Sequence, residues 1–108
     1  MTKYLANAFS LNMVDGPNSF PVCEGVVEAS QVMDLLGDDF TNAVGHQNTV
    51  DVLDNTFGFG LGVANRVSVS LEPGDLLVVA QYKGPRLNEG VTTLPDGARF
   101  EFWVFRVP

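Results

Sequence analysis

Cysteine and histidine are nearly absent, because the 108 residues contain one of each, Cys23 and His46. A single cysteine cannot form an internal disulfide, and one histidine with one cysteine cannot complete a zinc site. The acidic residues Asp34, Asp38 and Asp39 do not have the spacing of a calcium-binding loop. The sequence therefore predicts no metal and no other cofactor, and the lone thiol agrees with a reducing compartment.

Basic residues are also few. Six Lys and Arg stand against thirteen Asp and Glu, and the formal net charge is −7. A surface with this charge repels the phosphate backbone of duplex nucleic acid at long range, so we expect no duplex DNA or RNA partner. A small anionic ligand is still compatible with the sequence, because a few well-placed positive groups can hold it locally.

Long apolar runs are missing as well. The longest one covers residues 76–80, far less than a membrane-spanning helix needs, and the N-terminal MTKYLANAF lacks the apolar core of a signal peptide. We expect no membrane partner and a cytoplasmic location. The glycine-rich GFGLG at 58–62 follows an expected helix instead of joining a strand to a helix, so it does not predict a dinucleotide site.

The sequence does have the length and the apolar pattern of one small domain with one core. The pattern predicts an α/β fold of the α+β kind, in which a mixed and mainly antiparallel sheet of about five strands has flanking helices. The expected helices are residues 28–36, ended by Gly37, and residues 49–57, ended by Gly58. The expected strands are residues 4–9, an edge strand within 20–27, and residues 66–71, 76–82 and 99–107.

Two of these strands are expected to form a hairpin. Residues 66–71 alternate between polar and apolar side chains, and Glu72-Pro73-Gly74-Asp75 has the composition of a type II turn. Residues 76–82 would form the return strand. If the strands pair across that turn, antiparallel counting places Gln81 directly opposite Arg66.

The last expected strand carries aromatic side chains on both faces. Phe100 and Phe102 lie on one face, and Trp103 and Phe105 lie on the other. Helices are expected to cover one face, and a partner chain is expected to cover part of the other. The sequence therefore favours a homodimer.

His46 is the side chain best suited to proton transfer near neutral pH. It lies just before the second expected helix, where Asn48 or Thr49 is a natural N-cap and free amide groups can face an anion. A lone histidine in such a position is more often a structural residue than a catalyst.

Other polar residues also have an ordinary structural interpretation. Asn7, Ser10 and Asn12 interrupt an apolar stretch, and residues of these types commonly cap turns or bind backbone at strand ends. Arg86 and Glu89 fall in a loop after residues 76–82, where a surface ion pair is the default expectation. None of these residues predicts a function singly.

Together they carry a family resemblance. The stretches LANAFSLNM, NAVGHQNT, NRVSV and PRLNEG occur in this order, and with them the chain resembles the small viral ring nucleases. These are anti-CRISPR proteins that act against type III systems, known from archaeal viruses and found also in phages and prophages. The resemblance runs from the first strand to about Gly90 and resumes in the last strand. It implies a homodimer that binds cyclic tetra-adenylate, the second messenger of type III CRISPR complexes, across the two-fold axis and cuts it without a metal.

The resemblance also implies roles for individual residues. His46 falls on the family's catalytic histidine, and Glu89 falls on the glutamate that assists it. The positions that hold the ring correspond here to Asn7, Ser10, Asn12, Thr49, Arg66, Gln81 and Arg86. In such a ring the 2′-hydroxyl of one adenosine attacks the adjacent phosphorus and expels the 5′-oxygen, and histidine can supply the proton that the leaving oxygen needs.

The chain departs from the family's pattern at three places, one of which is an apparent extra residue before Arg86, next to Gly84-Pro85. Gln47 and Asn48 follow the histidine, where the family commonly has an acidic residue and then serine, and VTTLPDGA at 91–98 replaces a longer helical lid. Two alternatives to a nuclease therefore stay open. One is a non-catalytic binder that sequesters a cyclic oligonucleotide, and the other is a structural or host-interaction protein with the same fold.

Overall fold

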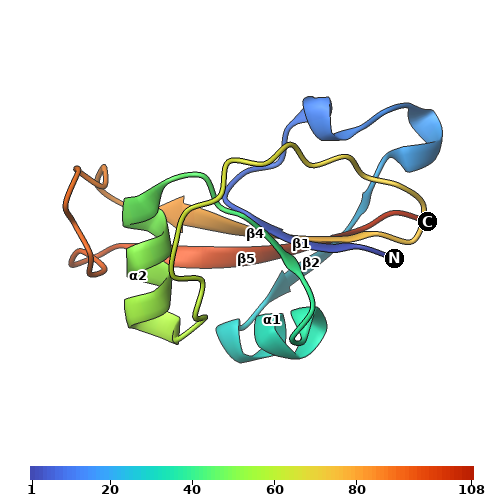
Figure 1. The fold of residues 1–108 in the computed structure, drawn as a ribbon. Coiled ribbons are helices and arrows are strands. Elements are labelled where there is room, and N and C mark those ends of the chain that lie inside the picture. The colour runs from blue at the N-terminus through green and yellow to red at the C-terminus, as the bar shows by residue number, and fades with distance from the viewer.

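Five strands form one mixed sheet in the computed structural model, which describes residues 1–108 (Figure 1). The strands are β1 (Lys3–Ala6), β2 (Val22–Val27), β3 (Thr41–Ala43), β4 (Leu76–Lys83) and β5 (Arg99–Arg106), and their order in the sheet is β2-β5-β4-β1-β3. β1 pairs parallel with β3 and β4, whereas β5 pairs antiparallel with β4 and β2. The antiparallel pairs are the longer ones, and the predicted fold class is confirmed.

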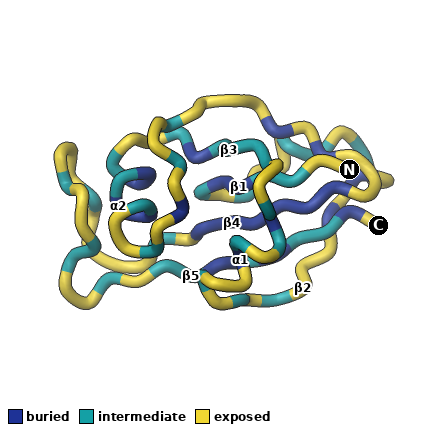
Figure 2. Tube along the Cα trace, turned by 60° about the horizontal axis from the view of Figure 1, so that its bottom comes forward, coloured by how far each residue is buried: buried dark blue, intermediate teal, exposed yellow.

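Two α-helices pack on one face of the sheet. α1 (Ala29–Leu36) and α2 (Gln47–Phe57) contribute Val32, Leu36, Val50 and Leu53 to a buried cluster with side chains of β1, β4 and β5. In Figure 1 the two helices lie below and to the left of the sheet, and Figure 2 shows that β4 is buried along most of its length. No helix has the length and apolar character that crossing a membrane requires.

The chain itself covers much of the opposite face. Residues 8–20, which contain the short 3-10 helices η1 (Leu11–Met13) and η2 (Pro17–Ser19), lie over this face together with residues 62–71 (Figure 1). A second buried cluster there includes Val69, Leu71, Leu77, Val79 and Val107, and Trp103 and Phe105 pack against it. The two-sided aromatic pattern of β5 is thus explained by two cores within one chain.

Glycine ends both helices, as their sequences predict. Gly37 follows α1, and its amide donates to the carbonyl oxygen of Met33 over 2.9 Å. Gly58 follows α2 in the left-handed conformation, with a φ of 72°, and its amide donates to Asp54 over 2.9 Å. A residue with a Cβ would be strained in that conformation, so glycine sets the end of α2.

The predicted hairpin between residues 66–71 and 76–82 is wrong. Residues 66–71 form no strand, apart from a single bridge between Leu71 and Val14, and β4 pairs with β1 and β5 instead. Gln81 therefore lies opposite Glu101 and not opposite Arg66. The apolar alternation has another cause, because Val69 and Leu71 pack onto the second face of the sheet.

Two other predictions, the turn at 72–75 and the edge strand within 20–27, are confirmed. The turn at 72–75 forms, with the amide of Asp75 donating to the carbonyl of Glu72 over 3.0 Å and a φ of 91° at Gly74. The segment within 20–27 is an edge strand, as its proline and glycine predict. β3 has no counterpart among the predicted strands, because Thr41-Asn42-Ala43 has neither the length nor the apolar composition of a typical strand.

Candidate functional site

β1 and β3 end side by side, and β4, which is parallel to β1, continues in the same direction to Lys83. In the register of β1, Ala6 lies beside Ala43 of β3 and Val79 of β4. The chain that leaves β1 therefore begins at Asn7 next to the chain that leaves β3 toward His46. The carboxyl ends of parallel strands are the usual place for a ligand in sheets of this kind.

A cavity of about 560 Å³ opens near these strand ends, at the start of α2. It is lined by His46, Gln47, Asn48, Asp51, Arg66, Glu89 and Gly90. Three of the predicted site residues, namely His46, Arg66 and Glu89, thus meet at one cavity although they come from three separate segments of the chain. No aliphatic, phenyl or indole side chain lines it.

His46 is the N-cap residue of α2. Its backbone is extended, its carbonyl oxygen accepts the amide of Val50 over 3.1 Å, and its side chain makes no capping hydrogen bond. The expectation that Asn48 or Thr49 caps the helix is wrong, because the helix already begins at Gln47. The imidazole is exposed at the cavity, beside the helix end that carries partial positive charge.

Arg66 reaches the cavity from a segment that is docked on β3. The amide of Asn65 donates to Val44 over 2.8 Å, and the Asn65 side chain donates to the carbonyl of Asn42 over 2.8 Å. Nε of Arg66 then donates to the carbonyl of Gly45 over 3.0 Å. A Cβ at Gly45 would lie 3.3 Å from Cγ of Arg66, so glycine allows this close approach. The terminal nitrogens of the guanidinium make no hydrogen bond to protein and can bind an anion.

Gln47 and Asn48 hold the two loops that border the cavity. Gln47 donates to the carbonyl of Gly62 over 3.0 Å and accepts the amide of Ala64 over 2.9 Å. Asn48 donates to the carbonyl of Leu87 over 3.1 Å. The loop of residues 84–98 that carries Glu89 is therefore attached to the first turn of α2.

Arg86 and Glu89 share that loop but form no ion pair. The only ion pairs in the chain are Arg99 with Glu101 and Arg106 with Glu24, both at 3.2 Å. The expectation of a surface pair between Arg86 and Glu89 is therefore wrong. Arg86 is exposed and does not line the cavity.

The remaining predicted residues lie outside the cavity wall. Oγ of Ser10 accepts the amide of Asn12 over 3.2 Å and caps η1, which is the ordinary structural role for a serine at a turn. Asn7 is half-buried just after β1, Thr49 is buried inside α2, and Gln81 is exposed on β4. The structure thus brings only His46, Arg66 and Glu89 of the predicted site residues to this cavity.

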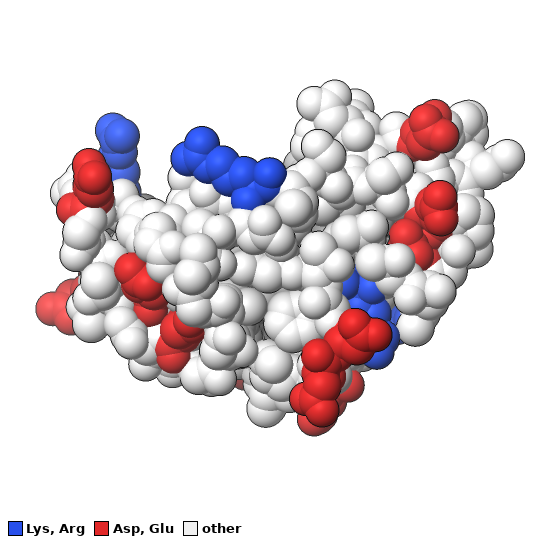
Figure 3. All heavy atoms as spheres, in the orientation of Figure 1, with Lys and Arg blue, Asp and Glu red and all other residues white.

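Most of the basic side chains lie toward this end of the molecule, where the cavity also has the carboxylates of Asp51 and Glu89. Arg66 lies at the cavity, Lys83 and Arg99 face each other where β4 and β5 join the 84–98 loop, and Arg86 lies in that loop. In Figure 3 basic side chains stand along the upper left of the molecule, and acidic side chains lie mainly on its flanks. The hydrogen bond from Arg99, with a smaller contribution from the indole of Trp103, holds the pKa of the Glu101 carboxyl below its usual value.

Comparison with known proteins assigns the chain to a family. The model of the STIV B116-like family matches residues 3–97, a span that contains every predicted site residue and the whole cavity. The chain belongs to the STIV B116-like family. B116 of Sulfolobus turreted icosahedral virus (STIV) has the same fold, with a TM-score of 0.77 and 24% sequence identity over 98% of this chain and 99% of that chain. No curated protein matches the chain.

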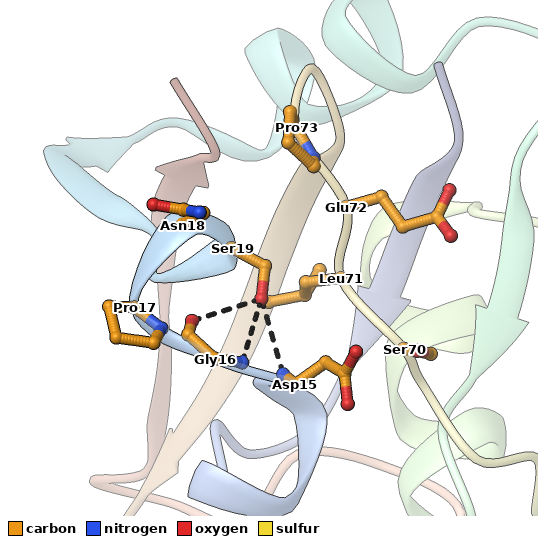
Figure 4. A pocket seen from close by; sticks show the side chains of 9 residues that line it. All are labelled: Asp15, Gly16, Pro17, Asn18, Ser19, Ser70, Leu71, Glu72 and Pro73. Atoms are coloured by element: carbon orange, nitrogen blue, oxygen red, sulfur yellow. Dashed lines mark hydrogen bonds between the residues drawn. The ribbon is translucent and has the colours of Figure 1, made fainter.

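A second cavity in this STIV B116-like chain contains none of the predicted residues. It has a volume of about 450 Å³ and lies between residues 15–19 and 70–73 (Figure 4). Oγ of Ser19 accepts the amides of Asp15 and Gly16 over 3.2 Å and donates to the carbonyl of Gly16 over 3.1 Å. The serine therefore fixes the local turn, and the carboxylates of Asp15 and Glu72 make this cavity unfavourable for a phosphate.

Sequence reasoning missed Asp51 and Gly90 in the STIV B116-like site and treated Gln47 and Asn48 only as departures from a pattern. The side chain of Gln47 donates to Asp51 over 2.9 Å. Residues four apart share one face of a helix, so Asp51 could have been found once the start of α2 was placed at Gln47. The bonds from Asn48 to residues 87 and 88 join distant segments and leave no local pattern in the sequence.

Proposed function

We propose that this protein is a metal-independent ring nuclease that binds cyclic tetra-adenylate, or a related cyclic oligonucleotide, and suppresses type III CRISPR defence by cutting it. The observation that supports the proposal is the meeting of His46, Arg66 and Glu89 at one cavity. A proton donor, a cation and a carboxylate are the groups that such a reaction needs. Membership of a family typified by a protein of an archaeal virus agrees with a role in a virus–host conflict.

The proposed reaction breaks one phosphodiester bond. The 2′-oxygen of one adenosine bonds to the adjacent phosphorus, the bond from phosphorus to the 5′-oxygen breaks, and the 2′-hydroxyl proton is released. His46, in its protonated form, gives a proton to the departing 5′-oxygen. The linear product carries a 2′,3′-cyclic phosphate at one end and a 5′-hydroxyl at the other.

Two other groups at the cavity assist this step. The carboxylate of Glu89 stabilises the positively charged imidazole by its own negative charge. Arg66 keeps its terminal guanidinium nitrogens free, and the start of α2 offers amide groups without partners inside the helix, so both can bind the phosphoryl oxygens. Negative charge that builds up on phosphorus-bound oxygen in the transition state is thereby offset.

A homodimer is part of the proposal. The cavity wall is polar throughout, and only the His46 imidazole and the Arg66 guanidinium offer planar surfaces on which an adenine base could stack. Val63 and Val67, on the segment that carries Arg66, are 72% and 42% exposed. A second copy that covers these apolar side chains would close the site and bring a second cavity to a ring that can itself be two-fold symmetric.

The test is single-turnover cleavage of labelled cyclic tetra-adenylate in the presence of a chelator. His46→Ala should lose on the order of 10²–10⁴-fold in rate, because general acid catalysis contributes that much, and should still bind the ring. Asp34→Asn, on α1, is the matched control, since it changes one exposed acidic side chain away from the cavity. Cleavage by His46→Ala at the wild-type rate would refute the assignment.

The same experiment separates the two remaining classes of function. Denaturing the wild-type mixture and resolving ring from linear product shows what was bound. Intact ring recovered in stoichiometric amount would indicate a non-catalytic binder. Absence of binding to rings of any size would indicate a structural or host-interaction protein.

A further inference from the structure

The loop of residues 84–98 is fastened along α2 at two points. Nδ2 of Asn48 donates to the carbonyl oxygens of Leu87 over 3.1 Å and Asn88 over 3.5 Å. Nδ2 of Asn55 donates to the carbonyl oxygen of Thr92 over 2.6 Å. Asn48 and Asn55 are seven residues apart, so they lie on the same side of α2 about two turns from each other.

The Tyr82 hydroxyl donates to the carbonyl of Pro85 and holds the start of the loop, but the rest of the loop has little other structure to hold it in place. Its internal backbone hydrogen bonds are those from Val91 to Asn88 over 3.1 Å and from Ala98 to Pro95 over 3.0 Å. No helix or strand forms between β4 and β5, and the residues from Asn88 to Gly90 are exposed. A segment with so few contacts opens readily, so the two asparagine side chains account for much of its fixed position.

The first attachment point is next to the proposed catalytic pair. Asn48 lies two residues after His46 in the chain, and the carbonyls that it binds belong to the two residues just before Glu89. Its amide is itself oriented, because Oδ1 accepts the backbone amide of Thr49 over 3.0 Å and leaves Nδ2 to face the loop. One side chain therefore connects the segment that carries the imidazole to the segment that carries the carboxylate.

We propose that Asn48 is a positioning residue that sets Glu89 beside His46, and that Asn55 holds only the far part of the same loop. This inference rests on the proposed function. The side-chain amide of Asn48 is occupied by protein groups, so the side chain acts through the loop and not by binding the ring. Loss of Asn48 should reduce the rate of the chemical step, because a displaced catalytic group is no longer aligned with the reacting atoms.

The experiment compares Asn48→Ala with Asn55→Ala in steady-state cleavage of cyclic tetra-adenylate. Asn48→Ala should lower kcat by roughly 10- to 100-fold with KM within about threefold of wild type, since the ring is still bound but Glu89 is misplaced. Asn55→Ala should leave kcat within about threefold, although it loosens the same loop. Equal losses in the two variants, or wild-type kcat in Asn48→Ala, would overturn the proposal.

A second measurement does not depend on catalysis. Amide hydrogen exchange at Val91, whose amide is bonded inside the loop, should be faster in both variants than in wild type, while α1 and β4 keep their protection. Unchanged exchange at Val91 would reject the attachment itself. If wild-type protein cuts no ring, the proposed function fails, and the role of Asn48 in positioning Glu89 for cleavage fails with it; faster exchange would then retain only the attachment of the loop.

Discussion

Gly84 offers a stability prediction that can be worked out from contact distances. It follows β4 with a φ of 152°, in a region that residues with a Cβ rarely adopt. A Cβ at this position would lie 2.6 Å from Cβ of Ala98, 2.9 Å from its Cα and 3.1 Å from the hydroxyl oxygen of Tyr82. Ala98 faces Gly84 where the 84–98 loop leaves the sheet, so the crowding involves backbone and cannot be relieved by a side-chain rotation.

The expected loss has two parts. Crowding a well-packed site costs about 1–3 kcal/mol, and placing a side chain on a residue with positive φ adds about 1–2 kcal/mol. Gly84→Ala should therefore lower the free energy of unfolding by roughly 2–5 kcal/mol. The loss reaches the upper part of that range only if Lys83 and Arg99, which face each other at the ends of β4 and β5, stay paired. Fraying of these strand ends would relieve the contact.

Urea unfolding of three variants isolates the crowding. Gly97→Ala is the matched control, because Gly97 has a φ of 79° in the same loop and its added Cβ would meet nothing within 4 Å. It should lose about 1–2 kcal/mol, the backbone part alone. Adding Ala98→Gly to Gly84→Ala removes the 2.6 Å contact and should restore part of the loss. A Gly84→Ala variant no less stable than Gly97→Ala, or no recovery in the double variant, would refute the reasoning.

Two further predictions concern assembly and charge. The proposed dimer should sediment at micromolar concentration at twice the 11.7 kDa of one chain, and a single 11.7 kDa species would contradict it. In a carboxyl NMR titration, Glu101 should titrate below its usual value of 4.5, so its contribution to stability is present above that pH and is lost as the pH falls through the lowered pKa. Arg99→Gln should move that titration upward, and an unchanged midpoint would exclude Arg99 as the main cause.

The helices were predictable because their positions are set locally. Val50, Leu53 and Phe57 recur at the spacing of one buried stripe, and Gly58 ends the helix in the one conformation that favours glycine. Only the starts differed, since α1 begins one residue later than predicted, at Ala29, and α2 begins two residues earlier than predicted, at Gln47. The sequence pattern and the observed helix agree where the interactions that set the helix lie within one turn of each other.

Strand pairing was less predictable, because it depends on residues far apart in the sequence. Residues 66–71 have the alternation of a strand, yet Val69 and Leu71 meet the sheet through side chains and not through a backbone ladder. Asn42 and Asn65 use side-chain amides to attach the preceding segment to β3. Alternation reports which side chains are buried, and it does not report which backbone groups are paired.

The candidate site likewise has residues that could be predicted from the sequence and residues that could not. His46, Arg66 and Glu89 could be selected from the sequence through the family resemblance, and the cavity contains all three. The roles of Gln47 and Asn48 could not be predicted, because their partners lie at residues 62–64 and 87–88. Residues that look like departures from a motif are, in this fold, the ones that attach both neighbouring loops.

The order of strands in the sheet also matters while the protein is being made. β1 is translated first, but one of its two neighbours, β4, begins only at Leu76, and β5, which joins β4 to β2, begins at Arg99. At roughly 5–20 residues per second, the backbone edges of β1 and β2 stay unpaired on the ribosome for a time on the order of 10 s. Because its partner strands emerge late, the nascent chain exposes unpaired strands that chaperones can bind and that can aggregate until β5 emerges.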